Sequence, residues 1–253
     1  MSEFKKAQAD FNSALNRLAY QKGINETFTD LLDTIICGMV LHDEKGLKRN
    51  PIKDYIPADQ ETMKVLLTTL GIIADNAGEG LHDALGDIFM EHLSFGRNGQ
   101  YFTPQPICDM MTQMTFHQQE IKPNQTVNDC ACGSGRMLLA AAKLSREFRF
   151  YGSDIDLTCV KMATVNLALN NLRGEISWAN PLTMEHYASF RVEREIFSGF
   201  PVIYIVGEQN SVQFGPKVLR SDDEKDQEKS PESVTELYPQ KERIEYQQLS
   251  LFV

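Results

Sequence analysis

The residues best suited to bind a small molecule form a glycine-rich turn, Gly133-Ser134-Gly135, between a short strand and a helix. Residues 126–128 are typical of the end of a β-strand, and residues 136–142 are typical of the first turns of a helix. Because glycine has no Cβ, the backbone of such a turn approaches a ligand closely, and the helix start offers free N–H groups to a carboxylate or phosphate. The turn therefore predicts a site for a ligand with an acidic group.

An acidic residue follows the glycine-rich turn at the distance expected of a ribose-binding carboxylate. Residues 148–153 predict a second strand, and Asp154 ends it roughly 20 residues beyond the glycines. An ordinary strand-to-helix turn is the alternative explanation of the glycines, but the spacing of Asp154 favours a nucleoside site. Arg136 stands where close packing on a pyrophosphate needs a small residue. A mononucleoside with a short charged tail is therefore expected rather than a dinucleotide.

Further strands and helices follow in the order expected of a Rossmann-like sheet. The sequence predicts a helix over 159–169, a third strand over 175–178 and a fourth over 201–206. This alternation indicates an α/β fold with a parallel sheet. The chain turns polar after Phe214, so no further strands are predicted and the sheet is expected to be incomplete.

The N-terminal region is predicted to be helical. Apolar residues recur at helical spacing in four segments: 4–20, 28–39, 62–74 and 81–90. Asp59 is expected to cap the third helix. His82 and His92 flank the fourth, with Asp83 and Asp87 between them. No H-E-x-x-H pattern of a metal site is present, so these four are expected to be helix-surface or packing residues. Because the region is not basic, we expect it to pack on the sheet or to dock a partner rather than to contact DNA.

The segment before the glycine-rich turn leads from a loop into another helix. Residues 96–99 break the preceding helix, and Pro104 suits the start of the next one, because its missing N–H costs nothing there. Apolar residues at helical spacing follow and are expected to pack in the core: Ile107, Met110, Met111 and Met114. Phe102 is expected either to join the core or to line the ligand site.

Two of these segments resemble motifs of a known family. Asp129-Cys130-Ala131-Cys132-Gly133-Ser134-Gly135 resembles the D-P-A-C-G-S-G motif of adenine-N6 DNA methyltransferases, with Cys130 in place of the proline. Gln100-Tyr101-Phe102-Thr103-Pro104 is similar to the G-Q-Y/F-F-T-P motif that precedes it in the modification subunits of type I restriction–modification systems. Two motifs in the same order and spacing are more specific than either alone. The resemblance extends over residues 81–183.

The resemblance implies S-adenosylmethionine as the cofactor, bound by a Rossmann-like methyltransferase sheet. It implies the following site: Gln100, Tyr101, Phe102, Thr103 and Pro104 on the methionine side, Asp129, Ala131, Cys132, Gly133 and Gly135 at the amino-acid tail, Asp154 with Ile155 at the ribose, and Asn180 facing the adenine.

The motif that grips the target base in this family is missing. Adenine-N6 methyltransferases carry [D/N/S]-P-P-[Y/F] after the fourth strand, where polar groups bind the exocyclic nitrogen and the aromatic ring stacks on the flipped base. This chain has residues 207–210, Gly-Glu-Gln-Asn, at that point, and it contains no P-P dipeptide. We therefore predict no catalytic residues, and a cofactor-binding protein that acts in DNA modification through partners. The alternative is an active adenine-specific methyltransferase completed by a specificity or methyltransferase subunit.

The composition limits how the chain meets DNA and other partners. A net charge of −10 and a pI near 5.0 argue against a broad phosphate-binding surface, so contact with DNA is expected to be weak or indirect. Five cysteines, an odd number, indicate a reduced, cytoplasmic setting, and Cys130-Ala131-Cys132 lacks the C-x-x-C spacing of a zinc site. The longest apolar run, residues 31–41, is too short to span a bilayer.

The C-terminal region is acidic and ends in an apolar peptide. Residues 217–247 have too little apolar surface to fold and are expected to be disordered. Gln248-Leu249-Ser250-Leu251-Phe252 resembles the peptide by which bacterial polymerases and repair proteins dock on the replication sliding clamp. The alternative is an apolar end that folds back on the core. The predicted domains are a helical domain over 1–95, a cofactor-binding core over 96–206 and a tail over 207–253.

Overall fold

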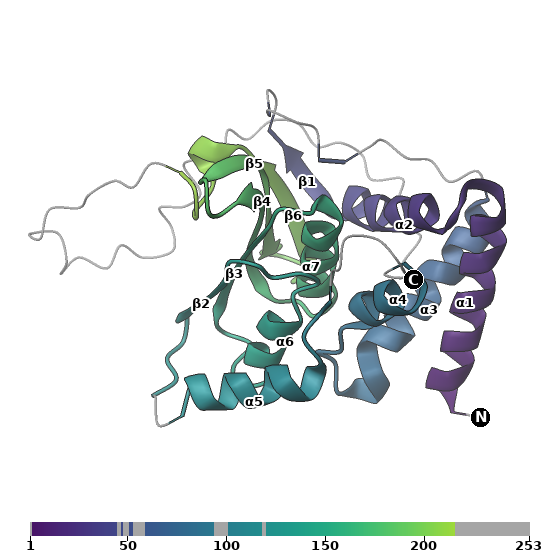
Figure 1. Cartoon of the computed structure of the whole chain (residues 1–253), viewed down its shortest axis with the longest axis horizontal. Helices are drawn as coiled ribbons and strands as arrows, with labels where there is room; N and C mark the ends of the chain where they lie inside the picture. Colours follow the sequence, from purple (N-terminus) through teal and green to yellow (C-terminus); the bar gives the residue numbers. More distant parts are fainter. Residues whose placement is uncertain are drawn as a thin grey trace, which may run out of the picture. The chain divides into compact units, whose positions relative to one another are not determined.

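A six-stranded sheet in the order β1-β6-β5-β4-β3-β2 organises the chain (Figure 1). The computed structural model describes residues 2–44, 47, 51–52, 59–93, 101–117 and 120–215. The strands are β1 (Val40–Asp43), β2 (Thr126–Asp129), β3 (Arg149–Asp154), β4 (Arg173–Asn180), β5 (Glu185–Arg194) and β6 (Pro201–Val206). β2, β3 and β4 are parallel to one another, β5 is antiparallel to both β4 and β6, and β1 is parallel to β6.

The predicted α/β fold is confirmed, but two strands were not predicted. β2, β3, β4 and β6 lie where the sequence indicates them, and β2–β4 with their helices form a Rossmann-like unit. β5 breaks the expected parallel order, and its inward residues Ala188, Phe190 and Val192 alternate with polar ones, as in a half-buried strand. β1 follows α2 directly, and its first two residues, Val40 and Leu41, end the apolar run 31–41, where periodicity alone does not separate strand from helix. The sequence analysis therefore missed β1 and β5, and its expectation of no strand after Phe214 falls on residues beyond 215, outside the described part of the chain.

The helices follow the predicted pattern closely. They are α1 (Glu3–Lys22), α2 (Ile24–Met39), α3 (Gln60–Asp75), α4 (Ala84–His92), α5 (Gln105–Thr115), α6 (Arg136–Ala142) and α7 (Leu157–Leu169), with short 3-10 turns η1 (Asn76–Gly78) and η2 (Glu208–Asn210). Asp59 caps α3 as predicted, because its carboxylate accepts the N–H of Thr62 at 2.9 Å. None of the helices in the described ranges is both long and apolar enough to cross a membrane.

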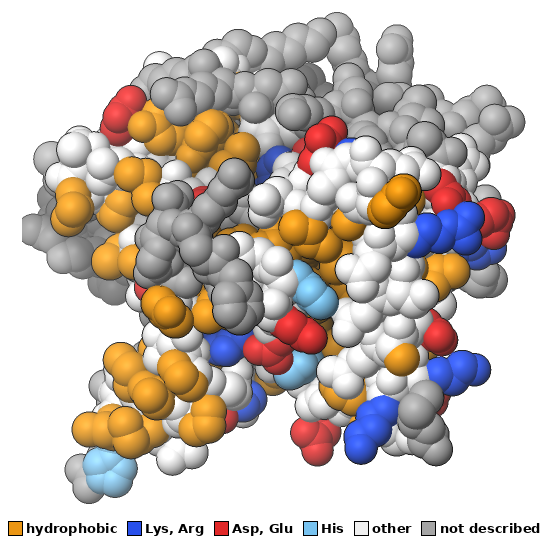
Figure 2. All heavy atoms as spheres, turned by 45° about the vertical axis from the view of Figure 1, so that its right-hand side comes forward, with side chains coloured by type: hydrophobic (Ala, Val, Ile, Leu, Met, Phe, Trp, Pro, Cys, Tyr) orange, Lys and Arg blue, Asp and Glu red, His pale blue; other side chains and the backbone are white. Residues whose placement is uncertain are grey.

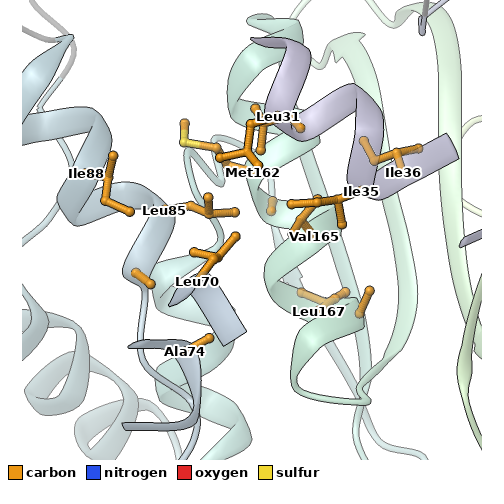
Figure 3. Packing of buried hydrophobic residues seen from close by; sticks show 14 of the residues in the cluster. Leu31, Ile35, Ile36, Leu70, Ala74, Leu85, Ile88, Met162, Val165 and Leu167 are labelled. Carbon is orange, nitrogen blue, oxygen red and sulfur yellow. The ribbon is translucent and has the colours of Figure 1, made fainter. Parts of the chain in front are cut away.

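The N-terminal helices and the sheet share one hydrophobic core. Figure 3 shows side chains of four helices meeting there: Leu31, Ile35 and Ile36 of α2, Leu70 and Ala74 of α3, Leu85 and Ile88 of α4, and Met162, Val165 and Leu167 of α7. A buried ion pair adds to this contact, with Lys161 Nζ of α7 at 2.6 Å from Asp33 Oδ1 of α2. The helical region therefore packs on the α7 side of the sheet, one of the two roles expected of it.

The apolar face of α5 is exposed, which contradicts the prediction that its methionines pack in the core. Met110 is 54% exposed and Met114 70%, and Ile107 and Met111 are exposed beside them. Figure 2 shows hydrophobic side chains gathered over this helix, at the lower left of the view. α5 buries Cys108 and Thr112 instead, and it packs against α6, which lies against the edge strand β2. Within the described residues no strand lies beyond β2 to cover the apolar face of α5.

Candidate functional site

The glycine-rich turn needs its glycines for both conformation and space. Gly133 and Gly135 have φ angles of 52° and 84°, in the left-handed region that other residues rarely adopt. A Cβ on Gly135 would also lie 3.2 Å from the Cβ of Ala163, so glycine lets the turn approach α7 closely. The N–H of Cys132 donates to the carbonyl of Ser153 at 3.0 Å. These contacts place the turn directly against the end of β3.

Asp154 lies beside the glycine-rich turn, as its spacing in the sequence predicts. One carboxylate oxygen accepts the N–H of Gly133 at 2.9 Å, and the other accepts the N–H of Asp156 at 2.9 Å. Burial raises the pKa of Asp154, and these N–H donors oppose the shift by favouring the ionised form. A carboxylate oxygen takes two hydrogen bonds, so Asp154 keeps acceptor capacity for hydroxyl groups of a ligand. The adjacent Ile155 is exposed.

The segment that contains Phe102 lies over the same turn. A Cβ on Gly133 would be 3.0 Å from ring atoms of Phe102, so the ring covers this glycine. The ring of Phe102 also lies 5.4 Å from that of Phe89, centre to centre. The ring therefore contacts both the core and the glycine-rich turn, and its role as a wall of the ligand site stays a prediction. Tyr101 beside it is 84% exposed, Thr103 and Pro104 lead into α5, and Gln100 lies outside the described residues.

The remaining predicted site residues lie at the ends of β2 and β4. Asp129 ends β2, where its carboxylate accepts the N–H of Ala131 at 3.1 Å and burial raises its pKa. Asn180 ends β4, and its side-chain oxygen accepts the N–H of Leu182 at 3.1 Å. Because β2, β3 and β4 are parallel neighbours, Asp129, Asp154 and Asn180 all lie at one edge of the sheet. This edge, with the turn and Phe102, is the candidate site.

A buried network that the sequence did not reveal holds the turn from the helix side. Asp83 Oδ1 accepts the N–H of Gly86 at 2.9 Å and Asn166 Nδ2 at 2.7 Å. Its Oδ2 accepts Ser134 Oγ at 2.5 Å and Arg136 Nε at 2.7 Å, and Arg136 also donates to Asp87 at 2.6 Å. Asp83 is only 1% exposed. Arg136 at the start of an otherwise apolar helix was the signal in the sequence for such a network, because a buried guanidinium needs an acidic partner.

Arg136 turns away from the candidate site into this network. The sequence predicts only that Arg136 replaces a third glycine of a dinucleotide motif. In the structure its guanidinium pairs with Asp83 and Asp87. Desolvation lowers the pKa of Arg136, but the two carboxylates outweigh it, so the pKa of Arg136 is raised. It therefore does not fill the ligand side of the turn. Asp83 is the buried N-cap of α4. The prediction of a helix-surface or packing residue therefore missed its role in this network.

A second buried polar cluster lies on the opposite face of the sheet. Ile176 of β4 belongs to the hydrophobic core, and Glu175 beside it points to the other face, because side chains alternate along a strand. Glu175 is 0% exposed and accepts Ser211 Oγ at 2.7 Å, the N–H of Val212 at 2.9 Å, and Arg191 Nη2 at 2.9 Å. This cluster fixes the segment after β6 over the sheet.

A serine–histidine pair in the second cluster is not a nucleophile. His186 Nε2 and Ser189 Oγ are 2.8 Å apart, the separation of an activated serine. Both residues are buried, at 1% and 0% exposure, and Ser189 Oγ also contacts Ser177 and Ser211. No substrate reaches a hydroxyl in this position, so the pair is part of the packing of β4 and β5.

The turn after β6 lies on the other half of the sheet from β2 and the glycine-rich turn, and one strand, β5, separates it from Asn180 at the end of β4. The N–H of Gly207 and Asn210 Nδ2 both donate to Glu44, at 2.8 and 3.0 Å. β6 pairs with β5 and β1, and three strands separate it from β2. The residues that stand in place of the base-gripping motif are therefore on the opposite half of the sheet from the glycine-rich turn.

Comparisons with known proteins find similarity over the part of the chain that contains the candidate site. Residues 81–197 match the family model of the N-6 DNA methylases. The chain is 28% identical over 100 residues to the release factor glutamine methyltransferase of Thermodesulfovibrio yellowstonii. The aligned region covers 39% of this chain and 36% of that protein. The matched region contains the predicted cofactor-site residues from Gln100 to Asn180.

Two solved structures are also similar to the chain. One is the methyltransferase subunit of a type I restriction-modification system from Streptococcus thermophilus, with 29% identity, a TM-score of 0.33, and coverage of 44% of this chain and 25% of that one. The other, from Listeria monocytogenes, is described as a class I S-adenosylmethionine-dependent methyltransferase, with 15% identity, a TM-score of 0.46, and coverage of 68% and 52%. The chain therefore spans about half or less of each of these three relatives.

Proposed function

Residues 81–197 place the chain in an N-6 DNA methyltransferase-like family, and on this premise we propose that it binds S-adenosylmethionine. In the proposed complex Asp129 and the glycine-rich turn hold the amino-acid tail of the cofactor. Asp154, with Ile155 beside it, binds the ribose hydroxyls, Asn180 faces the adenine, and residues 101–104 line the methionine side.

One observation supports this proposal above the others. Three segments that are separate in the sequence meet at the glycine-rich turn: the ring of Phe102 covers Gly133, and the carboxylate of Asp154 accepts its N–H. An aromatic wall, a free backbone turn and an acid at one sheet edge provide an apolar surface, N–H donors and a hydroxyl acceptor. Those are the groups that a nucleoside with an amino-acid tail requires.

We test the cofactor site by calorimetric titration of the full chain with S-adenosylmethionine. Asp154→Ala should raise the Kd at least tenfold, about 1.4 kcal/mol, because the ribose hydroxyls lose their acceptor. Asp109→Ala is the matched control, since Asp109 lies in α5 and pairs with Lys143 at the C-terminal end of α6, whose other end adjoins the glycine-rich turn. An unchanged Kd in Asp154→Ala would remove this residue from the site.

We further propose that the chain is incomplete for methyl transfer on its own. The sequence lacks the P-P motif, and the turn after β6 is three strands away from β2. Without fixed acceptors and an aromatic ring beside the cofactor, a flipped adenine has nothing to hold it. Transfer of a tritiated methyl group to mixed-sequence DNA by the purified chain alone would contradict this proposal.

The second candidate function is an active adenine-N6 methyltransferase completed by another subunit. The observation in its favour is the family match itself, together with a similar chain that is one subunit of a restriction-modification system. The same tritium assay, repeated with a lysate of the source organism, separates the two. Methyl transfer only in the presence of lysate, and lost with Asp154→Ala, would favour the second candidate.

The proposed route to DNA is through partners. The clamp-like peptide at residues 248–252 lies outside the described residues and rests on its sequence alone. Tethering by such a peptide would raise the local concentration at DNA of a chain whose net charge is −10. Deleting residues 248–253 should abolish binding to a purified bacterial sliding clamp in a pull-down. Binding that persists would show that the peptide is not used. A cytoplasmic location is part of the same proposal.

A further inference from the structure

We propose that Asp83, a residue of the N-terminal region, is a positioning residue for the glycine-rich turn. This inference rests on the proposed function, because it concerns what holds the turn in the shape that the cofactor meets. Asp83 precedes Ser134 by 51 residues and Arg136 by 53, yet its carboxylate contacts both side chains. It would act on the cofactor only through these neighbours.

All the acceptor capacity of Asp83 is used by three separate segments. Its two oxygens accept four hydrogen bonds, from α4 (Gly86), from the turn and the start of α6 (Ser134, Arg136), and from α7 (Asn166). An ionised carboxylate offers about four acceptor positions. The group is therefore saturated, and a change in any one donor leaves a buried acceptor or a buried charge without its partner.

One backbone hydrogen bond closes the turn itself, from the N–H of Gly135 to the carbonyl of Cys132 at 2.8 Å. Ser134 lies between Gly133 and Gly135, and glycine loses more conformational freedom on ordering than any other residue. Ser134 is held at two points, because its hydroxyl donates to Asp83 and its carbonyl accepts Asn166 Nδ2 at 2.8 Å. Gly133 is held on the ligand side by Asp154. Loss of the Asp83 contact would free the side chain of Ser134 and leave more of the turn to be ordered by the ligand, at the expense of affinity.

Gly86 offers a way to disturb this contact without removing any polar group. A Cβ on Gly86 would lie 2.0 Å from Asp83 Oδ2 and 2.6 Å from Ser134 Oγ, so Gly86→Ala must push these side chains apart. Gly71 of α3 is the matched control, because a Cβ there meets no atom within 4 Å. Both substitutions exchange glycine for alanine inside a helix and change helix propensity by similar amounts.

The experiment measures the Kd for S-adenosylmethionine by calorimetry, at a temperature where circular dichroism shows every variant fully folded. Gly86→Ala should raise the Kd about tenfold, and Gly71→Ala should leave it within about twofold of the unaltered chain. Ser134→Ala removes one donor and adds no bulk, so it provides a second variant should Gly86→Ala fail to fold. It should raise the Kd about fivefold.

The outcomes separate this inference from the proposed function. A purely structural role would lower the unfolding temperatures of Gly86→Ala and Ser134→Ala and leave the Kd of the folded proteins unchanged, which would overturn the inference alone. An equal rise in Gly71→Ala would overturn it too, since the effect would not pass through Asp83. An unaltered chain that does not bind the cofactor would overturn both the proposed function and the inference.

Discussion

Asp83 and Glu175 are two buried carboxylates held by the same kinds of donor on opposite sides of one sheet. Each accepts hydrogen bonds from an arginine, a serine hydroxyl and a backbone N–H: Arg136, Ser134 and Gly86 for Asp83, and Arg191, Ser211 and Val212 for Glu175. Both acids are almost fully buried, at 1% and 0% exposure. Their chemistry is therefore closely matched.

The difference lies in the segment that each acid holds. The serine bound to Asp83 belongs to the glycine-rich turn at the ends of the parallel strands, where the candidate site lies. The serine bound to Glu175 belongs to the segment after β6, which lies over β4 and β5 and reaches the carbonyl of Gly152 on β3 through Gln213. Two similar clusters thus stabilise the fold, and only one of them touches the proposed cofactor site.

The largest expected effect tests whether the two clusters are equal in stability. Asp83→Asn and Glu175→Gln should each lower the free energy of unfolding by about 3 kcal/mol, because a neutral amide replaces a buried carboxylate that pairs with an arginine and accepts several hydrogen bonds. For a chain of this size that corresponds to a fall in Tm of about 6–12 °C. Thermal unfolding followed by circular dichroism measures both. A large fall in one variant only would break the comparison.

The next effect tests whether the clusters differ in function. In folded protein, Asp83→Asn should raise the Kd for S-adenosylmethionine about tenfold, or about 1.4 kcal/mol, while Glu175→Gln should leave it within about twofold. Calorimetry under the same conditions provides both values. Equal losses of affinity would mean that general destabilisation, and not the contact with Ser134, weakens binding.

A smaller effect on stability, which depends on pH, distinguishes Asp154 in the candidate site from the buried carboxylates of Asp83 and Glu175. Burial raises the pKa of Asp154 in the folded state above its ordinary value of 3.8. The protonated carboxyl of Asp154 therefore stabilises the fold below its ordinary pKa, and this stabilisation is lost as the pH rises through the folded pKa. At neutral pH the ionised carboxylate opposes folding.

Asp154→Asn should consequently be more stable than the unaltered chain at pH 7, by less than about 1 kcal/mol because the group is partly exposed. The gain should shrink towards zero as the pH falls to about 4. Chemical denaturation at the two pH values measures it. A variant less stable at pH 7 would show that the N–H donors of Gly133 and Asp156 outweigh burial.

The smallest effect concerns the exposed face of α5, which belongs to neither cluster. Met114→Gln should change the free energy of unfolding by no more than about 0.5 kcal/mol, because the side chain is 70% exposed. Leu138→Ala in the adjacent helix α6 is the control, since Leu138 is fully buried and its truncation should cost about 2–5 kcal/mol. A large loss in Met114→Gln would show that this face is covered in solution.

Much of the candidate site could be predicted because its signals are local. The φ angles of Gly133 and Gly135, the N-cap at Asp59 and the strand that ends in Asp154 each follow from a few neighbouring residues. The exposed methionines could not be predicted this way. Helical spacing shows that an apolar face exists, but whether another strand covers that face depends on where the sheet ends.

The sequence by itself determined the alternation of strands and helices, the conformation of the turn and the acid that follows it. Backbone sterics and periodicity act over a few residues, so they can be read from the chain directly. Only the tertiary structure decided that Asp83 supports Ser134, that β5 and β6 extend the sheet away from β2, and that the methionines of α5 are exposed. Those contacts join residues that are far apart in the chain, and their partners are chosen by packing and by the need to pair buried charges.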